Sequence, residues 1–365
     1  MTDPKTRGAH KGAFPFRRLT QLGFALGALL TAVQFSRFVG SLSQAEPAAL
    51  ALRPAEVDAW LPISSFMSLV YLVRTGIANT VHPAGLVLFT LILFLAAAMR
   101  RGFCSWVCPV GALSEGVHLA GAFVFKRSAR LPKPLDLALR SIKYLMLAFF
   151  VFMICRMSVT EMRAFIYSPY NRLCDLKMYA MFSQPSAVTA GVVAVLGLLS
   201  LFYQGFVCRI LCPYGALLGL VSIVSPTAVR RDAARCLRCG ACSRACPSGL
   251  DVHARQTVRS PACTACYGCV TACPQPGALR MGLPGSRGIL TPRLYGLLTV
   301  AAFLFAARAF RAFGYWDADT PRELYRRYFA GPAAAEVSER LDRPGVDSGP
   351  SFPLMSAPVS GKNDS

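Results

Sequence analysis

The chain has 365 residues, of which 54% are hydrophobic and only 16% are charged, so it has few charges with which to cover a soluble surface. Lys and Arg outnumber Asp and Glu by 39 to 18, which gives a formal net charge of +21. This composition excludes a disordered chain, a collagen and a simple soluble enzyme, and it indicates a membrane protein. The chain is also too long for its 14 cysteines to be those of a small secreted disulfide scaffold.

Five apolar stretches between charged residues predict transmembrane helices, and hence an all-α polytopic membrane bundle. The stretches are residues 19–36, 83–99, 144–155, 187–207 and 294–307. The third stretch is short, so its crossing requires Arg140 and Lys143 to extend toward the interface. The last stretch, which we assign to a fifth helix over residues 291–310, is also short.

The distribution of Lys and Arg predicts the orientation of these helices. One set of segments holds 24 Lys and Arg against five acids, which places it in the cytoplasm; it comprises residues 1–18, 100–143 and 205–293. The intervening loops, 36–82 and 156–186, hold seven basic residues against five acids and are assigned to the outside. Five crossings of a bacterial inner membrane then make residues 311–365 a periplasmic, largely disordered tail.

Two segments leave this topology open. Trp60–Val73 is apolar but has about 14 residues, which is nearer to interfacial or re-entrant length, and a crossing there would reverse the side of everything downstream. Arg17 and Arg18 before the first apolar stretch are compatible with a signal peptide. Because that stretch is long and no sharp cleavage site follows, we expect residues 1–18 to be a cytoplasmic N-terminus and the first span to be uncleaved.

One motif occurs twice, at an offset of 104 residues. Both copies, Cys104-Ser-Trp-Val-Cys108-Pro109 and Cys208-Arg-Ile-Leu-Cys212-Pro213, follow an apolar stretch, so both belong to the cytoplasmic edge of a four-helix membrane domain, residues 19–225. C-x3-C places two thiols one helical turn apart, and the following Pro suits a helix start. The four thiols are candidate redox dithiols or ligands of a further metal or cluster; buried cysteines that only pack are the alternative.

A second cysteine pattern, C-x2-C-x2-C-x3-C-P, occurs twice within residues 226–290, which we assign to an inserted α+β ferredoxin domain on the cytoplasmic side. This pattern is typical of bacterial ferredoxins with two [4Fe–4S] clusters, in which the fourth Cys of each run binds the other cluster. Zinc is the alternative, but it requires neither the crossed ligand nor the trailing Pro. Gly240 and Gly268 are expected to relieve the backbone where it wraps around each cluster. The predicted ligands are Cys236, Cys239, Cys242 and Cys273 for cluster one, and Cys263, Cys266, Cys269 and Cys246 for cluster two.

The ferredoxin segment is strongly basic. From Arg230 to Arg287 there are nine Arg, no Lys and two Asp. Such a surface suits anionic headgroups or an acidic redox partner protein, although positive-inside bias alone explains it equally well. We expect membrane lipid and an unknown redox partner as its contacts, and no nucleic acid.

These features together resemble the NapH-type membrane component of periplasmic nitrate reductase systems and the membrane domain of the nitrous-oxide reductase regulator NosR. The segments FCSWVCPVGALSE, LDLALRSIKYL, SPYNRLCDLKM and CRILCPYGALLG carry the resemblance, which covers roughly residues 15–285. It implies quinol-linked electron transfer through iron–sulfur centres, with clusters on the ferredoxin cysteines and functionally required C-x3-C-P cysteines. The large periplasmic flavin domain of NosR has no counterpart in residues 36–82, which leaves the terminal acceptor open.

A quinone site needs an apolar slot and a proton acceptor, and His82 at the outer end of the second span is the candidate. The alternative for His82 is an interfacial histidine bonded to the backbone. The expected function is electron relay between the quinone pool and a redox partner, as a component rather than a stand-alone enzyme. A copper reductase or assembly factor for a respiratory metalloenzyme, and a redox-sensing regulator, are the alternatives.

Overall fold

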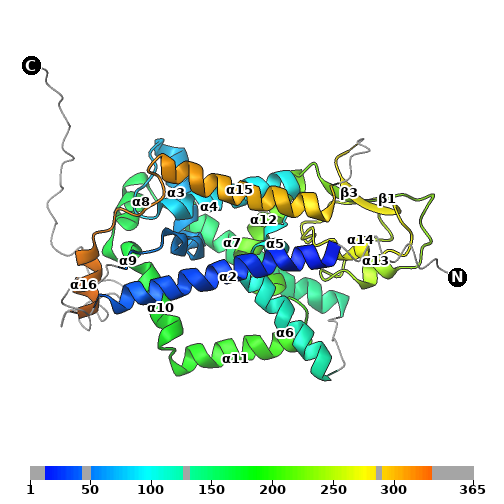
Figure 1. Cartoon of the computed structure of the whole chain (residues 1–365), viewed down its shortest axis with the longest axis horizontal. Coiled ribbons are helices and arrows are strands. Elements are labelled where there is room, and N and C mark those ends of the chain that lie inside the picture. The colour runs from blue at the N-terminus through cyan, green and yellow to red at the C-terminus, as the bar shows by residue number, and fades with distance from the viewer. Residues whose placement is uncertain (1–12, 43–50, 126–131, 285–289, 331–365) are drawn as a thin grey trace, which may run out of the picture. The chain divides into compact units, whose positions relative to one another are not determined.

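The computed structural model describes residues 13–42, 51–125, 132–284 and 290–330 (Figure 1). The chain divides into two units, residues 1–320 and 321–365. The first unit is mostly helical and contains every predicted site residue. The described part of the second is the helix α16, Arg322–Ala330, so the predicted tail lies largely outside the described residues.

Three helices in the described part of the chain are long and apolar enough to cross a membrane alone: α2 (Ala13–Gly40), α7 (Lys133–Arg156) and α15 (Pro292–Ala312). A bent pair, α10 (Cys174–Ser183) and α11 (Ala187–Phe202), meets at 76° and counts as a fourth if it forms one span. Leucines on the outer surface of α2 are more than half exposed, as expected of side chains that face lipid.

The remaining predicted span, residues 83–99, forms the helix α4 (Pro83–Met99). With 17 residues, α4 is shorter than the three long helices, and Ala84, Phe89, Ile92 and Ala96 are buried along it. Helices α3, α12 and α15 contact it, so it is largely enclosed by protein. The structure thus supports three to four spans, and a membrane crossing by α4 remains a prediction.

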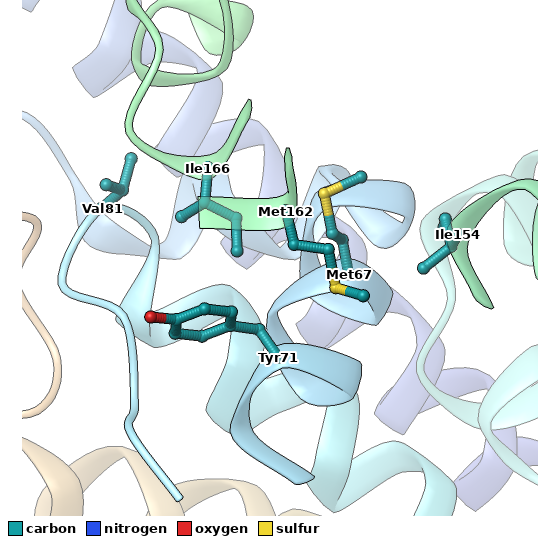
Figure 2. Packing of buried hydrophobic residues seen from close by; sticks show 6 residues of the cluster. All are labelled: Met67, Tyr71, Val81, Ile154, Met162 and Ile166. Carbon is teal, nitrogen blue, oxygen red and sulfur yellow. The ribbon is translucent and has the colours of Figure 1, made fainter. Parts of the chain in front are cut away.

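Trp60–Val73, the segment whose membrane crossing the sequence leaves open, largely forms the helix α3, Pro62–Thr75. This helix has 14 residues and is not among the candidate spans. It packs against α4 and α8 through a face that includes Ser64, Ser65 and Ser68. Figure 2 shows the hydrophobic cluster between α3, α7 and α8. Its buried members are Met67, Tyr71, Val81, Ile154, Met162 and Ile166.

Short elements connect the long helices. On the side away from the ferredoxin segment these are η1 (Ala55–Trp60), α8 (Val159–Ile166) and α9 (Pro169–Arg172). The two C-x3-C-P regions contain α5 (Phe103–Trp106), α6 (Pro109–Phe125), η2 (Val207–Leu211), α12 (Pro213–Val221) and η3 (Ser222–Val224).

The ferredoxin segment contains a three-stranded antiparallel sheet in the order β2-β1-β3. Its strands are β1 (Ala228–Arg231), β2 (Thr257–Val258) and β3 (Leu279–Gly282), and Val229 pairs with both Val258 and Met281. Each cysteine run contributes one helical turn, α13 (Ala241–Arg244) or α14 (Gly268–Thr271). This segment lies at one end of the first unit, beside the N-terminal ends of α2 and α15 (Figure 1).

Candidate functional site

The eight ferredoxin cysteines surround two separate small cavities. One cavity is lined by Cys236, Cys239, Cys242 and Cys273, together with Arg231, Pro274 and neighbouring residues. The other is lined by Cys246, Cys263, Cys266 and Cys269, together with apolar residues from the sheet. Each group contains three cysteines of one run and the fourth cysteine of the other run. The two groups are those that the crossed pattern predicts.

The backbone of both runs adopts the left-handed conformation at two matching positions. Arg238 has φ 52° and Gly240 has φ 69°, and the corresponding residues of the second run, Ala265 and Tyr267, have φ 50° and 61°. The expectation that Gly268 provides this freedom is wrong, because the left-handed residue is Tyr267, one position earlier. Positive φ at these positions turns the chain inward, so that all three cysteines of a run face one cavity.

Tyr267 is held in this conformation by its packing. Its ring contacts Trp106 and Tyr295 edge-on, with ring centroids 6.0 and 5.7 Å apart. Its hydroxyl donates a hydrogen bond of 2.7 Å to the carbonyl oxygen of Leu290. The cluster-two loop is therefore fixed against α5 and the start of α15.

The donor set fits a cluster better than a single metal ion. A zinc ion binds four thiolates at about 2.3 Å, which brings the sulfurs close together. A [4Fe–4S] cube of the bacterial two-cluster type takes three thiolates from one run and one from the other, which is the grouping around each of the two cavities. Burial raises the pKa of the Cys266 thiol to about 11, so a cationic cofactor is needed to deprotonate it near neutral pH.

The two C-x3-C-P motifs adopt similar local structures. In each, the first cysteine lies in a short helical turn, α5 or η2, and the Pro after the second cysteine begins the next helix, α6 or α12. Cys212 is the N-cap of α12, and its Sγ accepts a hydrogen bond of 3.3 Å from the backbone N–H of Gly215. Cys104 and Cys208 line the same cavity, and Cys108 and Cys212 each follow four residues later in their motif. The repeat therefore brings all four thiols into one place.

The first motif is bonded directly to the cluster-two loop. The hydroxyl of Ser105 donates to the carbonyl oxygen of Thr264 at 2.6 Å, and the indole N–H of Trp106 donates to that of Ala265 at 3.0 Å. Trp106 is fully buried. Sequence reasoning missed Ser105 and Trp106, although both lie inside the first motif.

Charged side chains of α7 complete this junction. Arg140 donates to the carbonyl oxygen of Ser248 and pairs with Asp136, which also pairs with Arg209 next to the second motif. Lys143, which we expected to extend toward the membrane interface, is only 2% exposed. It faces a cavity of about 240 Å³ that Cys104, Cys208 and Cys266 also line. This cavity connects the motif thiols with a predicted cluster-two ligand.

His82 lies at the opposite end of the helices, in a buried polar network. Its Nδ1 lies 2.9 Å from Asp58 Oδ1 and its Nε2 lies 2.8 Å from the carbonyl oxygen of Asn171. Both neighbours are acceptors, so the ring donates from both nitrogens and is protonated. Burial opposes this charge, but the hydrogen bonds and charges of Asp58 and Cys174 outweigh it and raise the pKa of His82 to about 10. As placed, His82 has no free lone pair for a quinol proton, and its quinone role remains a prediction.

A small apolar cavity of about 50 Å³ lies between α3, α4, α7 and α12. Its walls include Phe66, Phe89, Phe150, Leu217 and Tyr214. Tyr214 stacks on Phe89 with ring centroids 5.5 Å apart and is two residues from Cys212. Tyr214 follows Cys212 and Pro213 of the second motif, but nothing in the spacing of that motif marks it as a functional residue.

Two family profiles match the chain. One is described as a 4Fe–4S binding domain and matches residues 81–132 and 186–231; the other is described as a 4Fe–4S dicluster domain and matches residues 228–274. The first contains both C-x3-C-P motifs, and the second contains both ferredoxin runs. No solved structure matches the chain.

Curated relatives extend the similarity. YccM, a candidate electron transport protein of Escherichia coli K12, is 36% identical over 324 residues, which cover 87% of this chain and 90% of YccM. The ferredoxin-type protein NapH of the same organism is 27% identical over 57% of this chain and 70% of NapH. The regulatory protein NosR of Pseudomonas aeruginosa is 26% identical over 57% of this chain but only 29% of NosR.

The site and these relatives define the class: an iron–sulfur protein that transfers electrons, with a redox partner. The chain belongs to the NapH/NosR-type family of polyferredoxin-like 4Fe–4S proteins, which confirms the resemblance that its motifs predict. The apolar helices and the relatives together indicate a membrane protein.

Proposed function

We propose that this protein relays electrons between the membrane quinone pool and a redox partner through two [4Fe–4S] clusters on the cytoplasmic side of a bacterial inner membrane. Cluster one is held by Cys236, Cys239, Cys242 and Cys273. Cluster two is held by Cys263, Cys266, Cys269 and Cys246. The observation that carries the proposal is the grouping of these eight side chains around two cavities, with the second group next to the motif thiols.

Crossed ligation has a consequence for electron transfer. Because Cys246 follows the cluster-one cysteines and Cys273 follows those of cluster two, both runs hold both clusters, and neither cluster can move away from the other. Iron–sulfur clusters accept and release single electrons. Around them the protein supplies buried walls, including Val229, Val252 and Val258, that limit contact with water.

The quinone ring is proposed to enter the apolar cavity beside Tyr214, which has a volume of about 50 Å³ and must widen to admit the ring. This cavity lies between helices that expose leucine and phenylalanine to the surroundings, so a lipid-soluble ring can reach it from the bilayer. Oxidation of a quinol releases two protons along with two electrons, and because the walls of this cavity are apolar, the protons must leave through groups outside it. The electrons would then pass the C-x3-C-P thiols on the way to cluster two, because Cys104, Cys208 and the cluster-two ligand Cys266 line one cavity.

The test is quinol-driven reduction of the clusters in the full chain. Protein in liposomes is mixed anaerobically with a quinol, and the low-temperature EPR signals of reduced clusters are recorded. We expect signals from the wild type. Leu217→Trp, which fills the cavity, should slow reduction by about tenfold or more while dithionite still reduces the clusters. Leu220→Trp is the matched control on the same helix, because Leu220 is exposed and does not line the cavity.

Two other outcomes would overturn this function. Clusters that a quinol leaves oxidised, but that Cu(II) reoxidises after chemical reduction, would favour the copper reductase. Clusters that respond to neither and are lost in air would favour the redox sensor. Equal rates in both tryptophan variants would move the quinone away from Tyr214.

A further inference from the structure

Two buried cations lie beside the motif thiols. Arg101 is 4% exposed and Lys143 is 2% exposed, and both line the cavity that contains Cys104 and Cys208. Arg101 donates to the carbonyl oxygens of Gly215 and Pro261. Within the described residues, no Asp or Glu forms an ion pair with either side chain. An uncompensated buried charge is costly, so the site calls for an anionic occupant.

The four thiols are suited to supply that negative charge as cluster ligands. Cys104 and Cys208 line one cavity, and Cys108 and Cys212 each lie one helical turn further along the chain. Four cysteine thiolates are the usual ligand set of a [4Fe–4S] cluster. An oxidised [4Fe–4S] cluster with four thiolates carries a net charge of about −2, which Arg101 and Lys143 balance.

The local geometry also favours ligated sulfurs. Cys108 precedes α6 and Cys212 precedes α12, so each second thiol lies at a helix N-terminus, where N–H groups and the helix dipole stabilise negative charge. The hydrogen bond from Gly215 to Cys212 Sγ has the form that backbone amides make to cluster sulfurs. The profile described as a 4Fe–4S binding domain covers these two segments and stops before the ferredoxin cysteines.

We propose that Cys104, Cys108, Cys208 and Cys212 hold a third [4Fe–4S] cluster at the base of the helical bundle, with Arg101 and Lys143 as its counterions. This inference deepens the proposed function, because the site lies between the Tyr214 cavity and cluster-two ligand Cys266. One electron at a time would enter this cluster, oxidising the donor, and leave it for cluster two. The hydrogen bonds of Ser105 and Trp106 to the cluster-two loop keep the two sites at a fixed separation.

The test counts iron and sulfide in full-length protein that is purified and reconstituted anaerobically. Three clusters give about 12 iron atoms per chain and two give about 8. Replacing all four motif cysteines by Ser should remove about 4 iron atoms and leave the EPR spectrum of the ferredoxin pair. Cys155→Ser, at an exposed cysteine outside both sites, is the control and should keep the full count.

A count of about 8 in the wild type would overturn the third cluster while leaving the two-cluster function intact. One zinc or copper per chain at these thiols would overturn it as well. The wild-type count decides the matter even if the fourfold variant does not fold. Failure of the ferredoxin pair itself would instead appear as loss of its EPR spectrum, so the two proposals fail in different ways.

Lys143→Gln tests the counterion role without touching a ligand. Removing a positive charge next to the third cluster makes its reduction harder, so one component of a potentiometric titration should shift to a more negative potential. The remaining components should stay in place. Lys177→Gln on α10, far from the site, is the matched control and should shift none. Identical titrations of the two variants would contradict the assignment of Lys143.

Discussion

At the residue scale, both cluster loops contain residues in the left-handed backbone conformation. A residue with a side chain can adopt this conformation when packing contacts offset its energetic cost. A residue with a Cβ in the left-handed region costs roughly 1–2 kcal/mol. The first run has no such cost at Gly240, which lacks a Cβ. In the second run the cost falls on Tyr267, and the ring contacts of Tyr267 with Trp106 and Tyr295 offset it. The two loops are thus equivalent in backbone shape but different in what stabilises them.

This difference predicts effects of unequal size for two similar substitutions. Gly240→Ala puts a Cβ in the left-handed region and should cost about 1 kcal/mol, so that a chelator removes cluster one about fivefold faster. Gly268→Ala has an ordinary φ and a Cβ in normal contact distance of Ala245 and Cys266, so its effect should stay within about 0.5 kcal/mol. Bleaching of the cluster absorbance measures both. Equal rates would show that φ at position 240 is not what limits the loop.

At the scale of elements, the two C-x3-C-P units share a sequence pattern, but the first is packed more tightly around its glycine than the second. A Cβ on Gly111 would lie 2.2 Å from the carbonyl oxygen of Cys104, whereas the nearest atom to a Cβ on Gly215 is 3.5 Å away. The first turn of α6 therefore presses on the backbone of α5, and the first turn of α12 has room. Both units are hydrogen-bonded to the ferredoxin segment, the first through Ser105 and Trp106 and the second through Arg209, which donates to the carbonyl oxygen of Pro247 at 3.4 Å.

We therefore expect the repeat to respond asymmetrically to Ala. Gly111→Ala forces α5 and α6 apart and should cost about 1–3 kcal/mol, which for a unit of this size lowers the thermal midpoint by several degrees. Gly215→Ala should leave the midpoint nearly unchanged. Thermal unfolding of the two variants in the same detergent provides the comparison. A larger loss in Gly215→Ala would show that the second unit is the more tightly packed one.

At the scale of the whole molecule, the predicted orientation rests on charge bias, and the ferredoxin segment and the second unit offer protease sites to test it. Arg235 in the ferredoxin segment and Arg327 in α16 are both well exposed. Trypsin outside intact spheroplasts should cut the tail and leave the ferredoxin segment whole. In inside-out vesicles the ferredoxin segment should be cut first. Cleavage at Arg235 from outside would reverse the topology.

The spacing of the cysteines along the chain predicts which of them group together, because this grouping depends on local sequence. The crossed grouping of Cys246 and Cys273 follows from the motif, because each ligand is fixed by its distance from a neighbouring cysteine. The gathering of the C-x3-C-P thiols follows in part from the repeat and its position after apolar stretches. The confirmed family assignment rests on the same motifs.

Long-range contacts decide what the sequence does not reveal. Lys143 precedes an apolar stretch and suggests an interfacial side chain, but the fold buries it beside Cys104 and Cys208, which are far away in the chain. The protonated state of His82 depends on two acceptors, Asp58 and Asn171, that only the fold brings together. The reach of α4 is limited by Pro83 and by Arg100, whose φ of 65° ends the helix.

The most direct test of the account is the EPR spectrum of full-length protein, purified without oxygen and reduced with dithionite, together with its iron content. Two crossed [4Fe–4S] clusters predict a brown protein with at least about 8 iron atoms per chain and signals broadened by interaction between neighbouring clusters. A colourless protein that carries zinc in place of iron, with no such signal, would contradict it.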